Sequence, residues 1–205
     1  MLEISDEEII LNELNNKNNW YFLCANYKLS EEIMEQFEDK LYWDSISTYQ
    51  ELSENFIRKH INQVYWDYIS QYQKLSGPFM EENKDRINWF YISIYQTLSE
   101  DFMQKYKERL NWHEVSAYQK LSEPFIEKFK DKVHWNNISV YQKLSESFIE
   151  KHQNDINWEY ISKYQTLSED FINKFKDKVN LDLIFKHQKF IKHRGDLIEK
   201  NNNIE

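Results

Sequence analysis

The most reactive side chains are six histidines and one cysteine, and their spacing matches no metal-binding or catalytic motif. His60 and His152 occupy equivalent places, four units apart, in an internal repeat that is set out below, so we expect that they do not share a site. His113 precedes Glu114, but no second histidine follows four residues later, as zinc proteases require. We therefore interpret His60 and His152 as aromatic packing residues, and the sequence predicts no metal and no cofactor.

Cys24 is the only cysteine, so an internal disulfide is excluded and a reducing compartment is expected. Later repeats carry serine at the place of Cys24, which favours a small packing residue over a nucleophile. These serines recur in repeat after repeat, whereas catalysis needs a single constellation of groups. The sequence therefore predicts that the chain is not an enzyme.

Composition excludes further classes of function. The chain has 205 residues and a formal net charge of −9, which argues against specific binding to nucleic acid. Its 2 glycines cannot build a glycine-rich nucleotide-binding loop. No apolar run approaches the length of a membrane span, and the acidic N-terminus lacks a signal-peptide core. We expect a cytoplasmic protein that is neither secreted nor bound to a membrane.

A period of 23 residues organises the chain. It is marked by the tryptophans Trp20, Trp43, Trp66, Trp89, Trp112, Trp135 and Trp158, and Leu181 takes the next place. An aliphatic residue follows each tryptophan after three residues, a serine after four and a glutamine after seven, which is the spacing of one helical face. A fixed period of this length is typical of a repeat array.

The glutamines form the most conspicuous polar column: Gln50, Gln73, Gln96, Gln119, Gln142 and Gln165. Because a buried amide needs partners, we favour a structural ladder in which these amides bond along the stack. The alternative is a polar groove that binds the backbone of an extended peptide.

Each repeat then starts a second helix. Ser53 and its equivalents stand where an N-cap is expected, and Pro78 and Pro124 fit a first helical turn but not a helix interior. One long coiled coil is excluded, because 23 is not a multiple of the heptad. We predict an all-α solenoid of tandem two-helix repeats with a cap at each end. A capping helix is expected within residues 1–19, seven repeats within 20–180, and a degenerate eighth repeat with a C-terminal cap and tail within 181–205.

Charged residues also recur at fixed places. Acidic residues begin each second helix and basic residues end it, as helix-dipole complementarity predicts. In a stack, the basic residues would also form a charged edge that is able to bind an acidic or phosphate-bearing partner. The candidate binding residues of this basic edge are Lys105, Lys107, Arg109, Lys128, Lys130 and Lys132.

The repeat from Trp158 to Ile172, W-x-x-I-S-x-Y-Q-x-L-S-E-x-F-I, resembles short repeats in proteins of mimivirus-type giant viruses that infect amoebae. The likeness extends over residues 20–180, although Asn26 and Tyr27 replace Tyr-Gln in the first repeat. The resemblance implies a viral origin, hence the cytoplasm of an infected host cell or the virion, and it implies no catalytic activity.

We therefore expect a non-enzymatic scaffold that binds a host or viral protein. Exposed variable positions of the first helices would select the partner, among them Asp67, Tyr68, Phe90, Tyr91, Glu159 and Tyr160. The alternative is a structural building block that associates with itself or packs in a virion.

Overall fold

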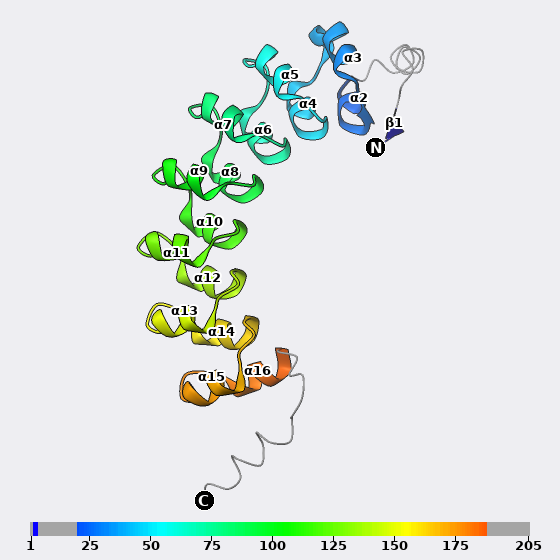
Figure 1. Ribbon diagram of the computed structural model, residues 1–205. Helices are drawn as coiled ribbons and strands as arrows, with labels where there is room; N and C mark the ends of the chain where they lie inside the picture. The colour runs from blue at the N-terminus through cyan, green and yellow to red at the C-terminus, as the bar shows by residue number, and fades with distance from the viewer. Residues whose placement is uncertain (1, 4–19, 188–205) are drawn as a thin grey trace, which may run out of the picture. The chain divides into compact units, whose positions relative to one another are not determined.

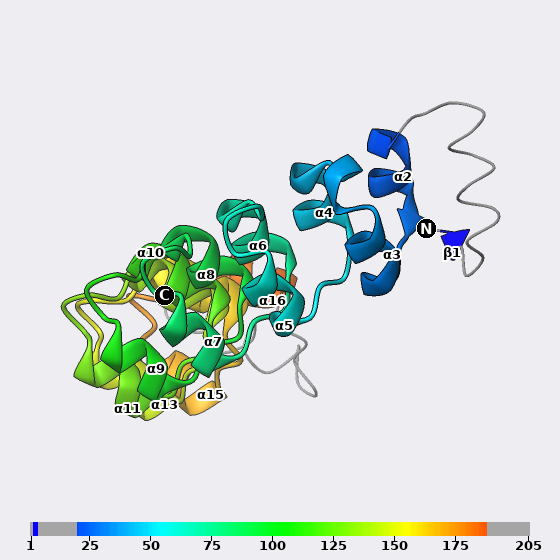
Figure 2. The same cartoon turned by 90° about the horizontal axis from the view of Figure 1, so that it is seen from above.

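The computed structural model describes residues 2–3 and 20–187, and the chain divides into two compact units, Met1–Asn111 (unit 1) and Trp112–Glu205 (unit 2). Each unit is a solenoid of stacked two-helix repeats, which confirms the predicted all-α repeat fold. Within each unit the first helices form one row and the second helices form another (Figures 1 and 2).

The first helix of each repeat begins at the tryptophan position and has seven residues. Unit 1 contains α2 (Trp20–Asn26), α4 (Trp43–Tyr49), α6 (Trp66–Tyr72) and α8 (Trp89–Tyr95), and unit 2 contains α10 (Trp112–Tyr118), α12 (Trp135–Tyr141), α14 (Trp158–Tyr164) and α16 (Leu181–His187). Because isolated helices this short are unstable in water, contact between neighbouring repeats must stabilise them.

The second helices have six residues. They are α3 (Glu31–Gln36), α5 (Glu54–Lys59), α7 (Gly77–Glu82) and α9 (Glu100–Lys105) in unit 1, and α11 (Glu123–Lys128), α13 (Glu146–Lys151) and α15 (Glu169–Lys174) in unit 2. Each is N-capped by the predicted serine; the Ser53 hydroxyl, for example, accepts a hydrogen bond from the Phe56 N–H at 3.1 Å. Pro78 and Pro124 lie in first turns, as predicted.

The core lies between the two rows of helices. The first-helix isoleucine of most repeats, such as Ile69, is 0 % exposed, and so is the Phe79 side chain on a second helix. The tryptophans after Trp20 are only partly buried, unlike the fully inward stripe that the helical spacing predicts. Their rings lie over the phenylalanine of the second helix, as in the stacked pair Trp66 and Phe79 with centroids 6.2 Å apart.

A buried glutamine directly follows each first helix from α4 to α14, and within a unit it bonds to the preceding repeat. The Nε2 of Gln73 donates to the carbonyl oxygens of Ser47 at 3.1 Å and Gln50 at 2.8 Å, while its Oε1 accepts from the Leu52 N–H at 3.0 Å. Equivalent bonds are made by Gln50, Gln96, Gln142 and Gln165. The amide thus satisfies carbonyls that the last helical turn leaves without partners.

The buried serine makes a second link between repeats. The Ser70 hydroxyl donates to the Trp66 carbonyl at 2.7 Å and accepts from the Asn88 N–H, the N-cap of the next first helix, at 2.9 Å. Cys24 takes this place in the first repeat and is 0 % exposed. Burial raises the pKa of the Cys24 thiol, which keeps it protonated and unreactive.

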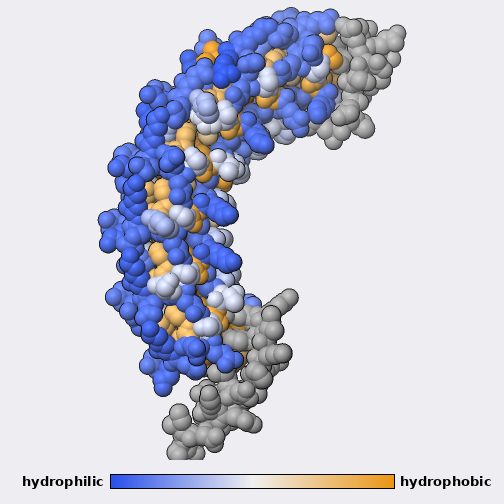
Figure 3. All heavy atoms as spheres, viewed as in Figure 1, coloured by the Kyte–Doolittle hydropathy of each residue, from blue (hydrophilic) through white to orange (hydrophobic). Residues whose placement is uncertain are grey.

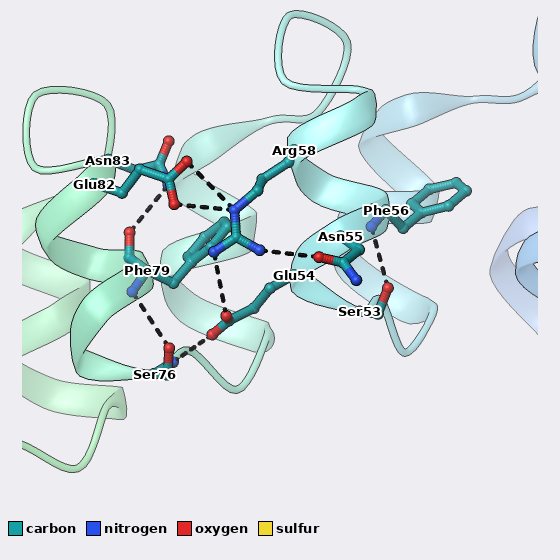
Figure 4. A network of polar contacts seen from close by, with 9 residues as sticks. All are labelled: Ser53, Glu54, Asn55, Phe56, Arg58, Ser76, Phe79, Glu82 and Asn83. Carbon is teal, nitrogen blue, oxygen red and sulfur yellow. Dashed lines mark hydrogen bonds and ion pairs between the residues drawn. The ribbon is translucent and has the colours of Figure 1, made fainter.

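A third link joins the second helices, as Figure 4 shows for α5 and α7. The Glu54 carboxylate accepts from the backbone N–H of Ser76 at 2.7 Å, and Arg58 forms an ion pair with Glu82 at 2.9 Å. Glu123 and Glu146 accept in the same way from Ser145 and Ser168. The acidic residue that was predicted from the helix dipole therefore also caps the next repeat.

The described ends include one element that the sequence did not predict. Leu2–Glu3 (β1) pairs in parallel with Tyr27–Lys28 (β2), so these two residues of the predicted N-terminal capping helix are extended. The rest of that helix, residues 4–19, and most of the predicted C-terminal cap, residues 188–205, lie outside the described residues. In the part that is described, no helix is both long enough and apolar enough to cross a bilayer.

We predict that Gln73→Leu lowers the free energy of unfolding by about 2–4 kcal/mol, because two buried carbonyls and one N–H lose their partner. Urea unfolding followed by circular dichroism measures this change. Gln71→Leu is the matched control, since this partly exposed side chain lies two residues earlier, within α6. Equal losses in the two variants would contradict the structural role of the Gln73 amide.

We predict that Gly77→Glu stabilises the chain. Gly77 stands where the other second helices begin with glutamate, and a Cβ atom added there would meet no atom within 4 Å. The new carboxylate would accept from Ser99, as Glu54 does from Ser76, and Glu123 followed by Pro124 shows that glutamate is accommodated before proline. The free energy of unfolding of Gly77→Glu should exceed that of the wild type by about 1–2 kcal/mol.

The control is Gly77→Ala, which changes the backbone entropy but adds no carboxylate. Thermal and urea unfolding of the three proteins give the comparison. A gain in Gly77→Glu no larger than that in Gly77→Ala would show that the carboxylate contributes nothing.

Candidate interaction surface

In each unit, the outer face of the first helices carries three exposed tyrosines at one repeat position. They are Tyr49, Tyr72 and Tyr95 in unit 1 and Tyr118, Tyr141 and Tyr164 in unit 2, with exposed fractions from 48 % to 63 %. We call these residues the tyrosine row. Each tyrosine precedes the buried glutamine and points away from the core, so packing of the solenoid does not explain it.

Unit 1 adds further aromatic side chains to this face. They are Tyr21, Phe22, Tyr42, Tyr65, Tyr68 and Phe90, all with more than a third of their surface exposed. The Tyr68 ring lies 6.0 Å from the Tyr65 ring and 6.3 Å from the Tyr72 ring, between centroids. At the matching places of unit 2 stand mostly polar residues, including His113, Glu114, Asn136, Asn137 and Glu159. The aromatic surface is therefore densest on unit 1.

Exposed apolar surface is otherwise limited. On the side of the molecule that Figure 3 shows, hydrophobic residues of each unit reach the surface in narrow strips between hydrophilic ones. The exposed large hydrophobic side chains of the described residues are all tyrosine or phenylalanine, and ten of the twelve are tyrosines. Such rings combine apolar area with a polar hydroxyl, which is the composition of protein interfaces.

The variable positions that the sequence singled out lie on this outer face. Asp67, Tyr68, Phe90 and Glu159 are exposed, whereas Tyr91 and Tyr160 are partly buried against neighbouring rings. The tyrosine row itself was not selected from the sequence. The signal was present, because the position six residues after the tryptophan lies about 110° from the centre of the helical stripe that carries the buried residues.

The predicted basic edge lies at the ends of the second helices, where much of its charge is paired within the chain. Lys105 contacts Glu81 at 2.7 Å, and Arg109 contacts Asp85 at 2.7 Å. The hydrogen bond to Glu81 raises the pKa of Lys105. Lys107 is also exposed in unit 1. These ion pairs recur between lysine and the carboxylate one repeat earlier, as in Lys151 with Glu127.

The other half of the basic edge belongs to unit 2. The Lys128 ammonium lies 5.8 Å from the Phe129 ring centroid, Lys130 is exposed, and Lys132 is partly buried. The Lys130 carbonyl accepts from the indole of Trp135 at 3.2 Å. Binding by the six basic residues stays a prediction, and the ion pairs reduce the charge that Lys105 and Arg109 offer to a partner.

Two of the histidines are buried in the core, as predicted for aromatic packing residues. His60 and His152 are buried at 2 % and 4 % exposure and lie over tryptophans, with 4.9 Å between the centroids of His60 and Trp43. His152 contacts Glu127 at 2.6 Å and Asp155 at 3.1 Å. Hydrogen bonds from Lys151 and His152 hold the pKa of Glu127 below its usual range.

The structure also brings together two histidines that the sequence treated separately. The rings of His113 and His134 lie 4.6 Å apart, because one repeat stacks on the next in unit 2. Across residues 2–3 and 20–187, no group of three or more His, Cys, Asp or Glu side chains is arranged to hold a metal ion. The exposed aromatic surface is thus the arrangement that best suggests function.

Comparison with known proteins does not assign the chain to a family. No protein-family model, curated protein or solved structure matches it.

Proposed function

We propose that the chain is a non-enzymatic scaffold for protein–protein interaction and that a partner protein binds the aromatic surface of unit 1. The observation that carries this proposal is the set of exposed rings on α2, α4, α6 and α8, which no packing role of the solenoid requires. Tyrosine is enriched at the energetic centres of interfaces because its ring buries a large area with little loss of side-chain entropy.

The rows of the solenoid suit such a role. The first helices are held to one another by buried amide and hydroxyl bonds, such as those of Gln73 and Ser70, so their outer faces are positioned before a partner arrives. A surface that is ordered in advance loses less conformational entropy on binding. Exposed rings of neighbouring repeats also contact each other, as Tyr21 of α2 and Tyr42 just before α4 do, with 5.7 Å between ring centroids.

The biological setting of this scaffold is also a proposal. It depends on the repeat resemblance alone, which suggests a giant virus and the cytoplasm of its host cell. The alternative function is self-association, in which one copy of the chain binds another through the same rings. The experiment below distinguishes self-association from binding of a different protein.

We predict that replacing Tyr49, Tyr72 and Tyr95 by serine abolishes partner capture. The matched control replaces Tyr118, Tyr141 and Tyr164, the same residue at the same repeat position in unit 2. Tagged proteins are used as bait in amoebal lysate, and captured proteins are identified by mass spectrometry. The unit 1 variant should lose a partner that the wild type and the unit 2 variant retain.

Equal capture by all three proteins would contradict a partner site on unit 1. Recovery of untagged copies of the chain alone, with a matching dimer by light scattering, would instead support self-association. Charge reversal of Lys105, Lys107 and Arg109 tests whether the partner binds the basic edge. If it does, these variants should lose capture, and added salt should weaken capture by the wild type.

A further inference from the structure

A tyrosine-lined hollow of about 270 Å³ lies on the outer face of unit 1. Its lining comes from three neighbouring first helices: Tyr21 from α2; Asp44, Ser45, Thr48 and Tyr49 from α4; and Tyr68 and Tyr72 from α6. Ser45 and Thr48 are small, whereas α6 carries Tyr68 and Gln71 at the same two places. The hollow therefore arises where one repeat has short side chains between aromatic neighbours.

Asp44 gives this hollow a negative charge. Its Oδ1 accepts hydrogen bonds from the Ser45 N–H at 2.7 Å and from the Ser45 hydroxyl at 3.4 Å. No lysine, arginine or histidine among residues 2–3 and 20–187 forms an ion pair with Asp44. The carboxylate is thus available to a cation from outside the described chain.

The surrounding helices reinforce this charge. The sequences of α2, α4, α6 and α8 contain no basic residue, and their only ionised side chains at neutral pH are Asp44 and Asp67. The basic residues just after these helices are Lys28, which pairs with Glu51 at 3.2 Å, and Lys74. An anionic ligand would meet repulsion here, whereas a cation would meet a carboxylate and the electron-rich faces of tyrosines.

Unit 2 contains an example of the same contact within the chain. On α14, Lys163 stands beside a member of the tyrosine row, and its ammonium nitrogen lies 4.9 Å from the Tyr164 ring centroid. The first helices of unit 1 have no lysine at the place of Lys163, and no cation of the described chain lies over Tyr49, Tyr68 or Tyr72. A ring of the tyrosine row therefore binds a cation in unit 2, where Lys163 precedes Tyr164. In unit 1 the chain places no lysine at the equivalent positions.

We propose that the hollow around Asp44 binds an arginine or lysine side chain from a basic segment of the partner protein. This inference rests on the proposed function and names the chemistry of the partner. The cation forms an ion pair with Asp44 while its flat or alkyl portion lies against Tyr68 and Tyr72. Arginine is the better match, since a guanidinium stacks on aromatic rings and bonds to a carboxylate at the same time.

The test uses the full chain and a fluorescein-labelled arginine–glycine repeat peptide, with binding followed by fluorescence anisotropy. A glutamate–glycine peptide is the probe of opposite charge and should not bind. Asp44→Asn should raise the Kd about tenfold, and added salt should weaken binding. The matched control is Glu159→Gln, which removes the same charge at the same repeat position in unit 2.

A second pair of variants distinguishes the contribution of the aromatic face of Tyr72 to peptide affinity from the contribution of its apolar volume. Tyr72→Phe keeps the aromatic face and should change the Kd less than twofold, whereas Tyr72→Leu keeps apolar volume without the ring and should raise it about five- to tenfold. Because Tyr72 is 51 % exposed, both variants should fold, which far-UV circular dichroism checks.

Equal weakening by Asp44→Asn and Glu159→Gln would overturn the inference, since it would show attraction by net charge alone. Equal affinities of Tyr72→Phe and Tyr72→Leu, or no binding of the arginine peptide, would also overturn it. These failures leave the proposed function intact if the tyrosine-row variants still lose the captured partner, because that partner would then be recognised by other chemistry.

Discussion

The stack depends on one buried carboxamide per repeat. A helix of seven residues leaves its last four backbone carbonyls without helical partners, and in α4 the Ser47 carbonyl is one of these and is buried against the next repeat. The side chain of Gln73 bonds to two of the carbonyls that belong to the preceding helix and to one N–H just after it. Without this amide the repeats would have to leave buried polar groups unpaired, which the apolar contacts of so short a helix would not offset.

The other inter-repeat bonds follow from the geometry that the glutamine sets. Once two first helices are held in register, Ser70 reaches the N–H of the residue that N-caps the next first helix, and Glu54 reaches the serine that caps the next second helix. Inward positions are therefore constrained in every repeat. Outward positions such as Asp44 and Tyr68 have no part in these bonds, so they are free to differ between repeats and to carry binding specificity.

Much of the fold could be predicted from the sequence because its signals are local. The tryptophan period, Ser53 as an N-cap and Pro78 in a first turn each specify a boundary without knowledge of the neighbouring repeat. The contacts between repeats could not be predicted in detail, because they depend on the register of the stack. That register decides that Glu54 caps the next helix, that Lys105 pairs with Glu81, and that Trp66 lies partly at the surface.

The candidate surface was predicted only in part, for a related reason. The positions of Tyr68 and Phe90 stand out in the sequence because they vary, whereas the tyrosine row is nearly invariant among repeats and resembles a packing residue. Its helical angle points to solvent, but its regular recurrence is also what a packing position shows. The hollow at Asp44 is beyond sequence reasoning, since it needs side chains from three separate helices to be placed side by side.

The inter-repeat bonds of the glutamine, serine and glutamate links reach only the adjacent repeat, across sequence separations of 18 to 26 residues. A gene that lost or duplicated one segment of 23 codons would therefore encode a chain in which these bonds are made again wherever the newly adjacent repeats carry the glutamine, serine and glutamate. The array is able to lengthen or shorten by unequal recombination without the design of any new contact, and the number of repeats is a quantity that evolution can vary independently of the fold.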